Sequence, residues 1–133
     1  MPQTRTLPTL GAFPPPGLSF MHVVHHANLP HLHLAGELCV AAADRSRGIE
    51  AFEVWVRTLE PGAHTEALHH DGELVVLALA GVGKVLIDGG PQRFHGPCTL
   101  LVPARTPFQF VNDGTVPLQL VWVHSAKPVA HSG

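Results

Sequence analysis

The sequence predicts an all-β domain that follows an irregular N-terminal arm. The chain contains 13 glycines and 13 prolines among its 133 residues, a high share for a helical bundle and a natural one for short strands joined by tight turns. Hydrophobic residues make up 45% of the chain, enough to fill a core and to exclude wholesale disorder. A length of 133 residues fits one domain.

Turn signals built from Gly, Pro, Asp and Asn recur along the chain from Leu34 onward. Short runs rich in β-branched and aromatic residues lie between them, and none shows a sustained period of about 3.6 residues. This alternation is typical of an all-β sandwich or barrel, with helix only as a short terminal piece. The expected strands are residues 38–42, 52–59, 74–80, 84–87, 99–102, 108–111 and 118–124.

The domain organisation follows from where these signals begin. Residues 1–30 are rich in Pro and His with weak periodicity, so we expect an irregular arm there. Residues 31–133 then form one domain, with no internal repeat and no linker.

Charge and apolar runs exclude several partners. The net charge is −2, and the eight Lys and Arg residues are scattered singly, so there is no basic surface for nucleic acid. No apolar run approaches the roughly 20 residues of a membrane span, and no signal peptide opens the chain. Cys39 and Cys98 make neither a disulfide framework nor a zinc knuckle. We therefore expect a cytoplasmic protein that contacts neither nucleic acid nor membrane.

Four segments, in order, carry a family resemblance: residues 61–73, 81–89, 103–112 and 117–123. Each joins a Gly- or Pro-containing turn to a strand. Together they resemble the cupin superfamily, most clearly over residues 52–123. The resemblance implies a double-stranded β-helix, the jelly-roll barrel of small single-domain cupins.

Members of this family usually bind a divalent metal, and their two motifs imply where the ligands lie. In this chain the four expected ligand positions hold Leu68, His70, Leu74 and Phe108. Only His70 can ligate, and protein metal sites generally need three or four ligands. Three large apolar groups would also dry the pocket and oppose a charged ion. The expectation is a degenerate metal site and no cofactor.

Two alternative metal sites stay open. A divalent zinc, nickel, iron or manganese ion could be held by His70 together with His64, Glu66, His69 or Glu73, since strand alternation or a bulge could turn some of these inward. His31, His33 and Glu37 reproduce a ligand spacing on their own, but without the Gly pattern around it. The chain has eleven histidines, and we expect these six at the surface or in the arm: His22, His25, His26, His95, His124 and His131.

Arg57 is the charge most suggestive of a ligand. It interrupts an apolar strand whose side chains alternate in direction. If the odd-numbered ones face inward, Arg57 points into the barrel, where it can pair with an anionic ligand or with a carboxylate such as Glu66. Trp55 and Trp122 are expected to fill the barrel, and Cys98 to be a buried structural thiol. The expected pocket residues are Arg57, Glu66, Leu68, His70, Leu74, Phe108, Gln109 and Trp122.

The sequence thus predicts a small cupin-like protein that binds a small molecule in its barrel without the usual metal. The alternatives are a metal-dependent enzyme of the oxygenase or isomerase type, with shifted ligands around His70, and a small-molecule sensor module. The resemblance also implies a homodimer. The sequence leaves open which molecule binds and whether any reaction occurs.

Overall fold

The structure is a computed structural model that describes residues 23–126. Most of the predicted arm, with His22, and also His131 lie outside the described residues. Within them the chain forms nine strands and two short 3₁₀ helices, η2 (His26–Asn28) and η3 (Arg45–Arg47). No α-helix occurs between residues 23 and 126, and the all-β prediction is confirmed.

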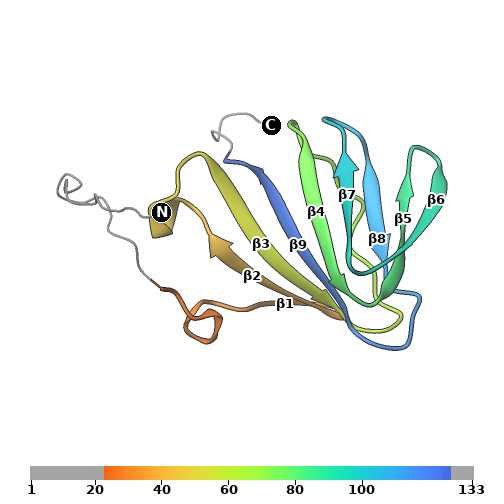
Figure 1. Ribbon diagram of the computed structural model, residues 1–133, viewed down its shortest axis with the longest axis horizontal. Helices are drawn as coiled ribbons and strands as arrows, with labels where there is room; N and C mark the ends of the chain where they lie inside the picture. The colour runs from red at the N-terminus through yellow and green to blue at the C-terminus, as the bar shows by residue number, and fades with distance from the viewer. Residues whose placement is uncertain (1–22, 127–133) are drawn as a thin grey trace, which may run out of the picture.

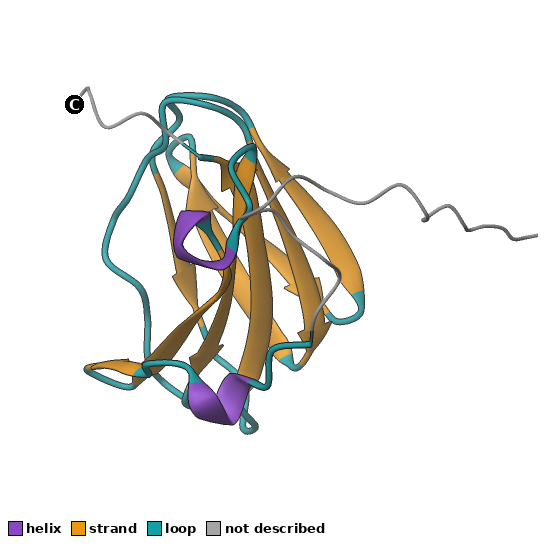
Figure 2. Ribbon diagram, turned by 90° about the vertical axis from the view of Figure 1, so that its left-hand side faces the viewer, coloured by secondary structure: helices purple, strands orange, loops and turns teal. Residues whose placement is uncertain are grey.

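The strands form two antiparallel sheets that face each other (Figures 1 and 2). The larger sheet has six strands in the order β1 (Leu32–Leu34), β2 (Glu37–Ala43), β3 (Phe52–Leu59), β9 (Leu118–Ser125), β4 (Leu74–Ala80) and β7 (Cys98–Val102). The smaller sheet has three, in the order β6 (Gly90–His95), β5 (Val82–Ile87) and β8 (Phe108–Val111).

The connection between β3 and β4 extends the smaller sheet. Residues 62–68 run antiparallel to β8, with isolated bridges that pair His64 with Val111 and Leu68 with Phe108. The amide of Leu68 donates to the carbonyl of Phe108 (2.9 Å), and the amide of Phe108 donates back (2.8 Å). The segment that carries Glu66 and Leu68, two of the expected pocket residues, is therefore fixed by backbone hydrogen bonds.

Alternation along the central strands decides which side chains face the interior. In β9 the buried residues are Leu118, Leu120 and Trp122, and their partners on β3 share that face: Leu59, Arg57 and Trp55. The core between the sheets consists mainly of aliphatic and aromatic residues, including Leu74, Val76, Val102, Phe108 and Phe110.

The smaller sheet does not cover the whole of the larger one. Figure 1 shows β5, β6 and β8 beside β4 and β7, whereas β1 and β2 lie at the other end of the sheet. Leu32 and Leu34 share the inner face with their partners Cys39 and Glu37, yet they are 52% and 44% exposed. Within the described residues, the inner face near β1 is therefore open.

Gly81 makes the corner between β4 and β5. Its φ of +101° lies in the left-handed region that favours glycine, and a Cβ there would come within 2.8 Å of the Pro117 carbonyl oxygen. No helix in the described part of the chain is long and apolar enough to cross a membrane.

Candidate functional site

The four positions that the family motifs assign to metal ligands do come together. Leu74 and Phe108 are buried in the core, and the half-buried Leu68 packs against the same cluster. Leu68 also pairs directly with Phe108. The ring of His70 stacks against Phe108, with 6.3 Å between centroids. These four positions thus form a mainly apolar corner of the barrel, to which His70 contributes an imidazole.

His70 is held by its backbone as well as by its ring. The amide of Arg105 donates to the His70 carbonyl over 2.6 Å. Arg105 occupies the position where the second family motif has glycine, and it keeps the left-handed conformation there, with φ +58°. The ring of His70 lies 6.2 Å from that of Trp122 and 4.4 Å from that of His124, centroid to centroid.

His124 is the residue that reasoning from the sequence missed. We expected it at the surface, but its side chain is only 12% exposed. It pairs with the buried Leu74 across the sheet and has the same parity as Leu118, Leu120 and Trp122, so it faces inward. That parity was the signal that could have found it. The other surface histidines in the described part, His25, His26 and His95, are exposed as expected.

The contacts of His124 determine where its ring can exchange a proton. Nδ1 lies 3.0 Å from the Ser125 carbonyl, which can only accept, so Nδ1 carries the proton of the neutral ring. Nε2 lies 3.9 Å from Glu53 Oε1. Glu53 is held in place by Trp55, whose Nε1 donates to the same oxygen over 3.0 Å. A proton on Nε2 would therefore face a carboxylate.

The alternative ligands proposed around His70 do not join it. His69, Glu66 and Glu73 are exposed. His64 pairs with Val111 in the extension of the smaller sheet, and its Nδ1 contacts the Thr65 carbonyl at 2.9 Å. The regular strand that would have aligned His64 with His70 does not form. Among residues 23–126, no group of three His, Cys, Asp or Glu side chains is placed to hold a metal ion, so the family's metal does not fit these residues.

His31 and His33 do not build a second metal site with Glu37. Both histidines are exposed, and His31 Nε2 contacts the carbonyl of His26 at 2.9 Å. The carboxylate of Glu37 is engaged with an arginine instead.

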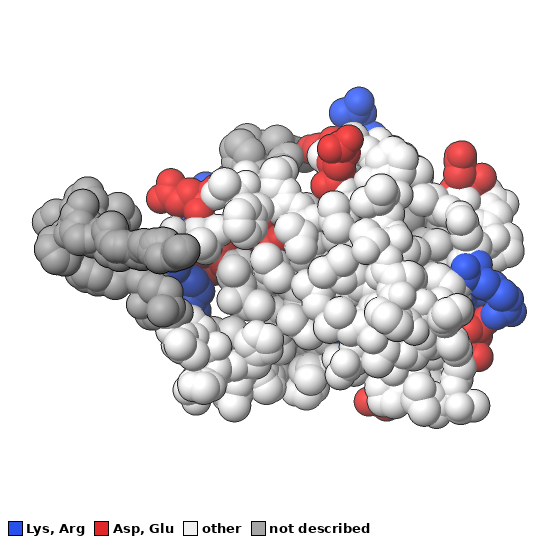
Figure 3. Space-filling view, in the orientation of Figure 1, with Lys and Arg blue, Asp and Glu red and all other residues white. Residues whose placement is uncertain are grey.

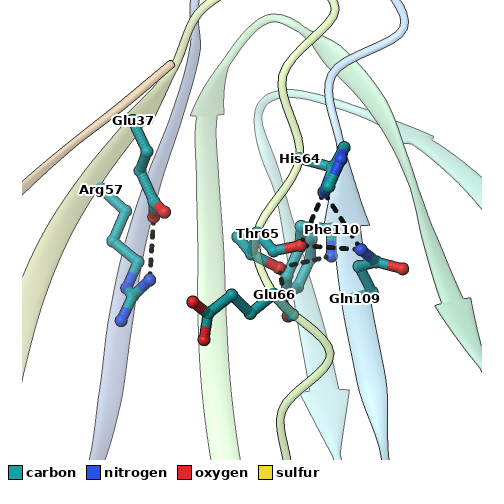
Figure 4. Close-up of polar contacts among 7 residues, drawn as sticks. All are labelled: Glu37, Arg57, His64, Thr65, Glu66, Gln109 and Phe110. Atoms are coloured by element: carbon teal, nitrogen blue, oxygen red, sulfur yellow. Dashed lines mark hydrogen bonds and ion pairs between the residues drawn. The ribbon is translucent and has the colours of Figure 1, made fainter. Parts of the chain in front are cut away.

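Gln109 lies on the outer face of β8, opposite in direction to the buried Phe108 and Phe110. Its Nε2 donates to the Thr65 carbonyl over 2.8 Å and lies 3.1 Å from His64 Nδ1. Buried Thr65 in turn accepts from the amide of Phe110 (Figure 4). The structure thus gives Gln109 a place in fastening residues 64–66 to β8 and not in the barrel interior.

Arg57 faces the interior, but its carboxylate partner is Glu37 and not Glu66. Arg57 Nη1 donates to Glu37 Oε2 over 2.8 Å, and the two side chains are 18% and 3% exposed (Figure 4). They belong to neighbouring strands and face the same side, which sequence spacing could not show. The guanidinium also stacks on Trp122, with Cζ 4.1 Å from the ring centroid, a cation–π contact.

Two N–H donors of this stacked pair are buried without a hydrogen-bond partner within the described part of the chain: Arg57 Nε and Trp122 Nε1. Most buried polar groups in proteins are paired, and an unpaired one costs stability. These donors are therefore the strongest local sign that the interior accommodates an oxygen acceptor.

Cys39 lies on the same inner face, opposite Arg57, and is 1% exposed. Burial raises the pKa of its thiol to about 11; Arg57 opposes that rise, and the charge and hydrogen bond of Glu37 add to it. The thiol is a buried neutral group and not a reactive nucleophile.

A cavity of about 260 Å³ opens beside Glu37. It is lined by the β1–β2 turn and by residues 62–66, including Leu34, Ala63, His64 and Glu66. Figure 4 shows the Glu66 side chain extending away from Gln109, toward the side on which Arg57 lies. The cavity therefore borders the Arg57–Glu37 pair on its Glu37 side.

The arrangement can do two things chemically. The unpartnered N–H groups of Arg57 and Trp122 can bind and polarise an acceptor oxygen. The adjacent imidazoles of His70 and His124 can hold or exchange a proton. Arg57, Trp122 and His124 lie on the inner face of the larger sheet, and the His70 ring contacts that of His124 from the connection between β3 and β4.

Comparison with solved structures identifies the fold. The polyketide cyclase RemF from Streptomyces resistomycificus matches with a TM-score of 0.71 and 18% identity, over 85% of this chain and 88% of that one. A predicted oxalate decarboxylase from Thermotoga maritima matches with a TM-score of 0.69 and 15% identity, over 80% and 100%. A sugar phosphate isomerase of the cupin superfamily from Silicibacter pomeroyi matches with a TM-score of 0.63 and 25% identity, over 70% and 61%.

No curated protein sequence matches the chain significantly. The family model described as a cupin domain matches residues 55–124, which is more than half of the 133 residues and runs from β3 to β9. With the paired antiparallel sheets and the matching solved structures, this shows that the chain belongs to the cupin family.

Proposed function

We propose that this protein binds a small organic molecule on the inner face of its six-stranded sheet, without the divalent metal that cupins usually hold. One observation carries the proposal. Leu68, Leu74 and Phe108, at the positions of the missing ligands, pack into one apolar cluster, whereas the inward-facing polar groups gather beside it on β2, β3 and β9.

Both parts of the interior favour an organic molecule over an ion. An ion near His70 would lose its water and gain at most the imidazole nitrogens of His70 and His124, fewer than the three or four ligands that protein metal sites generally need, which is unfavourable by several kcal/mol. An organic molecule would instead bury apolar surface against the cluster and meet polar groups at a few fixed points, as ligand pockets commonly do.

The comparisons support this class of ligand. Two proteins of the same fold are named as a polyketide cyclase and a sugar phosphate isomerase, and both names refer to small organic molecules. The likeness to the cyclase is one of fold alone, so the choice of molecule has to come from the residues of this chain.

The experiment uses untagged protein, since an affinity tag would add histidines. We expect far less than one transition metal per chain by elemental analysis, and a Tm that EDTA leaves unchanged. In EDTA, a fragment screen by thermal shift should still find small molecules that raise the Tm, because binding to the native state stabilises it.

The competing function is a metal-dependent enzyme with shifted ligands. One tightly bound metal per chain, lost in His70→Ala and kept in the control His69→Ala, would establish that competitor and refute the proposal. A complete lack of stabilising fragments would also count against it.

A further inference from the structure

The two unpartnered donors on the inner face narrow the class of ligand. Arg57 Nε and Trp122 Nε1 are both buried and both lack a partner among residues 23–126. They belong to one stacked pair, since Arg57 Cζ lies 4.1 Å from the centroid of the Trp122 ring. Trp122 is 1% exposed, so ordinary bulk water does not satisfy its N–H.

The guanidinium is held in position before any ligand arrives. Nη1 is engaged by Glu37 at 2.8 Å, and Cζ lies over the Trp122 ring, so the guanidinium is held at two points. The Nε–H edge is left as a donor of fixed direction. A trigonal oxygen has two lone pairs, so a single carbonyl oxygen can accept from two such donors.

The charges around the site oppose a strongly anionic ligand. The charge of Arg57 is offset by Glu37. A second carboxylate, that of Glu53, lies 3.9 Å from His124 Nε2. Glu66 lines the cavity that opens beside Glu37. With three carboxylates against one guanidinium and two imidazoles, a dianion such as a phosphate monoester would meet repulsion, whereas a neutral carbonyl would not.

The walls favour a flat ligand. The donors sit beside the rings of His70 and Phe108, whose centroids lie 6.2 Å and 5.4 Å from that of Trp122. Toward β1 the same face carries the exposed Leu32 and Leu34. Aromatic rings and leucines offer apolar contact to a flat conjugated molecule.

We infer that the ligand is a flat, conjugated carbonyl compound of low charge, such as an aromatic ketone, whose carbonyl oxygen accepts hydrogen bonds from Arg57 Nε and Trp122 Nε1. This inference rests on the proposed binding function and gives it a chemical class.

The test uses acetophenone as the probe and ethylbenzene as its counterpart without the carbonyl. The chain has two tryptophans, so a ¹H–¹⁵N spectrum shows two indole N–H signals, which either Trp122→Phe or Trp55→Phe is enough to assign. Acetophenone should shift the Trp122 indole signal and the Arg57 Nε–H signal. Ethylbenzene should leave both nearly unchanged.

Variants then separate the hydrogen bonds from the fold. Trp122→Phe keeps a ring and removes the N–H, and Arg57→Lys keeps the charge and removes the Nε edge. Each should weaken acetophenone binding roughly fivefold, the value of one lost hydrogen bond. The control is Arg93→Lys, at an exposed arginine of β6 that pairs with Asp113 and lies outside the proposed site; it should bind acetophenone as the wild type does. The wild-type spectrum decides the matter even if a variant fails to fold.

Each contrary result has a distinct meaning. If ethylbenzene shifts the two signals as strongly as acetophenone, or if benzoate or phenyl phosphate binds more than tenfold tighter, the carbonyl inference is wrong while small-molecule binding stands. If none of these probes shifts either signal, the inference is also wrong. The fragment screen in EDTA then decides separately whether the binding function survives.

Discussion

Arg57 and Glu37 form the one ion pair in the described residues that is largely removed from solvent. Such a pair contributes little net stability compared with apolar residues of the same size, but removing one partner leaves the other charge buried and uncompensated. Glu37 has the smaller exposure, 3%, so it suffers more from the loss of its partner.

We therefore expect Arg57→Met to lower the free energy of unfolding by about 2–4 kcal/mol. The double variant Arg57→Met with Glu37→Met should recover most of that loss, as measured by urea denaturation. The matched control is the exposed pair of Arg93 and Asp113, joined at 2.6 Å with Arg93 74% exposed. There Arg93→Met should cost less than about 1 kcal/mol. Equal losses at the two pairs would contradict the assigned burial.

Cys39 makes the free energy of unfolding depend on pH in the alkaline range. Its thiol pKa is raised from 9.0 to about 11 in the folded protein, so between those values the unfolded chain loses a proton that the native state retains. Below pH 9 the thiol therefore leaves the free energy of unfolding unchanged. As the pH rises toward 11, that free energy falls by about 1–2 kcal/mol.

The chain contains no tyrosine, which leaves few other groups to titrate in that range. Cys39→Ala should flatten the decline in unfolding free energy between pH 9 and 11, whatever its effect at neutral pH. The control Cys98→Ala removes the half-buried cysteine and should keep the decline. A Cys39→Ala protein with an unchanged slope would show that another group is responsible.

Seven of the nine strands were predicted from the sequence to within two residues at each end, because each combines β-branched or apolar residues with turn signals on both sides. The two that were missed lack this pattern. β1 has only three residues, Leu32–Leu34, and β6 begins Gly90-Pro91-Gln92-Arg93. Proline is tolerated in β6 because it is an edge strand of its sheet. Each forms because it pairs with the strand next to it in the chain across a two-residue turn, β1 with β2 across residues 35–36 and β6 with β5 across residues 88–89, and not because of its own composition.

In the candidate site too, some residues could be placed from the sequence alone and others only from the pairing of strands. The positions of Leu68, Leu74 and Phe108 followed from motif spacing, since each family motif counts residues along one continuous segment of the chain. The partner of Arg57 and the inward direction of His124 depended on the register between strands. Glu66 was the expected partner, and it is exposed. A one-residue change of register reverses every side chain, so these contacts needed the structure.

If only the side chains prevent metal binding, restoring the ligands should restore it. Leu68 pairs with Phe108, Leu74 pairs with His124, and the His70 ring contacts those of both Phe108 and His124, so the four positions adjoin one another. The triple variant Leu68→His, Leu74→Glu, Phe108→His should melt lower than the wild type without metal, because each change costs about 1–3 kcal/mol.

Zinc or nickel should then raise the Tm of the triple variant and leave that of the wild type unchanged. Adding His70→Ala to the triple variant should weaken this rescue. A triple variant that folds but gains no metal-dependent stability would mean that the four positions do not face a common point.

The outer face of the six-stranded sheet is apolar across five strands. One row of paired residues joins Leu101, Val75, Val123 and Val54, and the next joins Leu77, Val121, Val56 and Val40. Leu101 is 74% exposed. The central part of the face shown in Figure 3, over β9 and β4, carries few charged side chains. Apolar surface of this extent commonly marks a protein–protein interface.

The homodimer implied by the resemblance can therefore be given a location. We expect two copies to bury this outer face against each other, since a symmetric dimer brings the same patch of both subunits together.

Val121→Lys places a charge in the middle of the rows and should convert the dimer to a monomer at micromolar concentration, as measured by sedimentation equilibrium. Gln92→Lys, on an exposed position of β6, is the control and should stay dimeric. Val121 is only part-buried in one chain, so the substitution should leave the fold of the subunit intact by circular dichroism. A wild type that sediments as a monomer, or a Val121→Lys protein that still dimerises, would place the contact elsewhere.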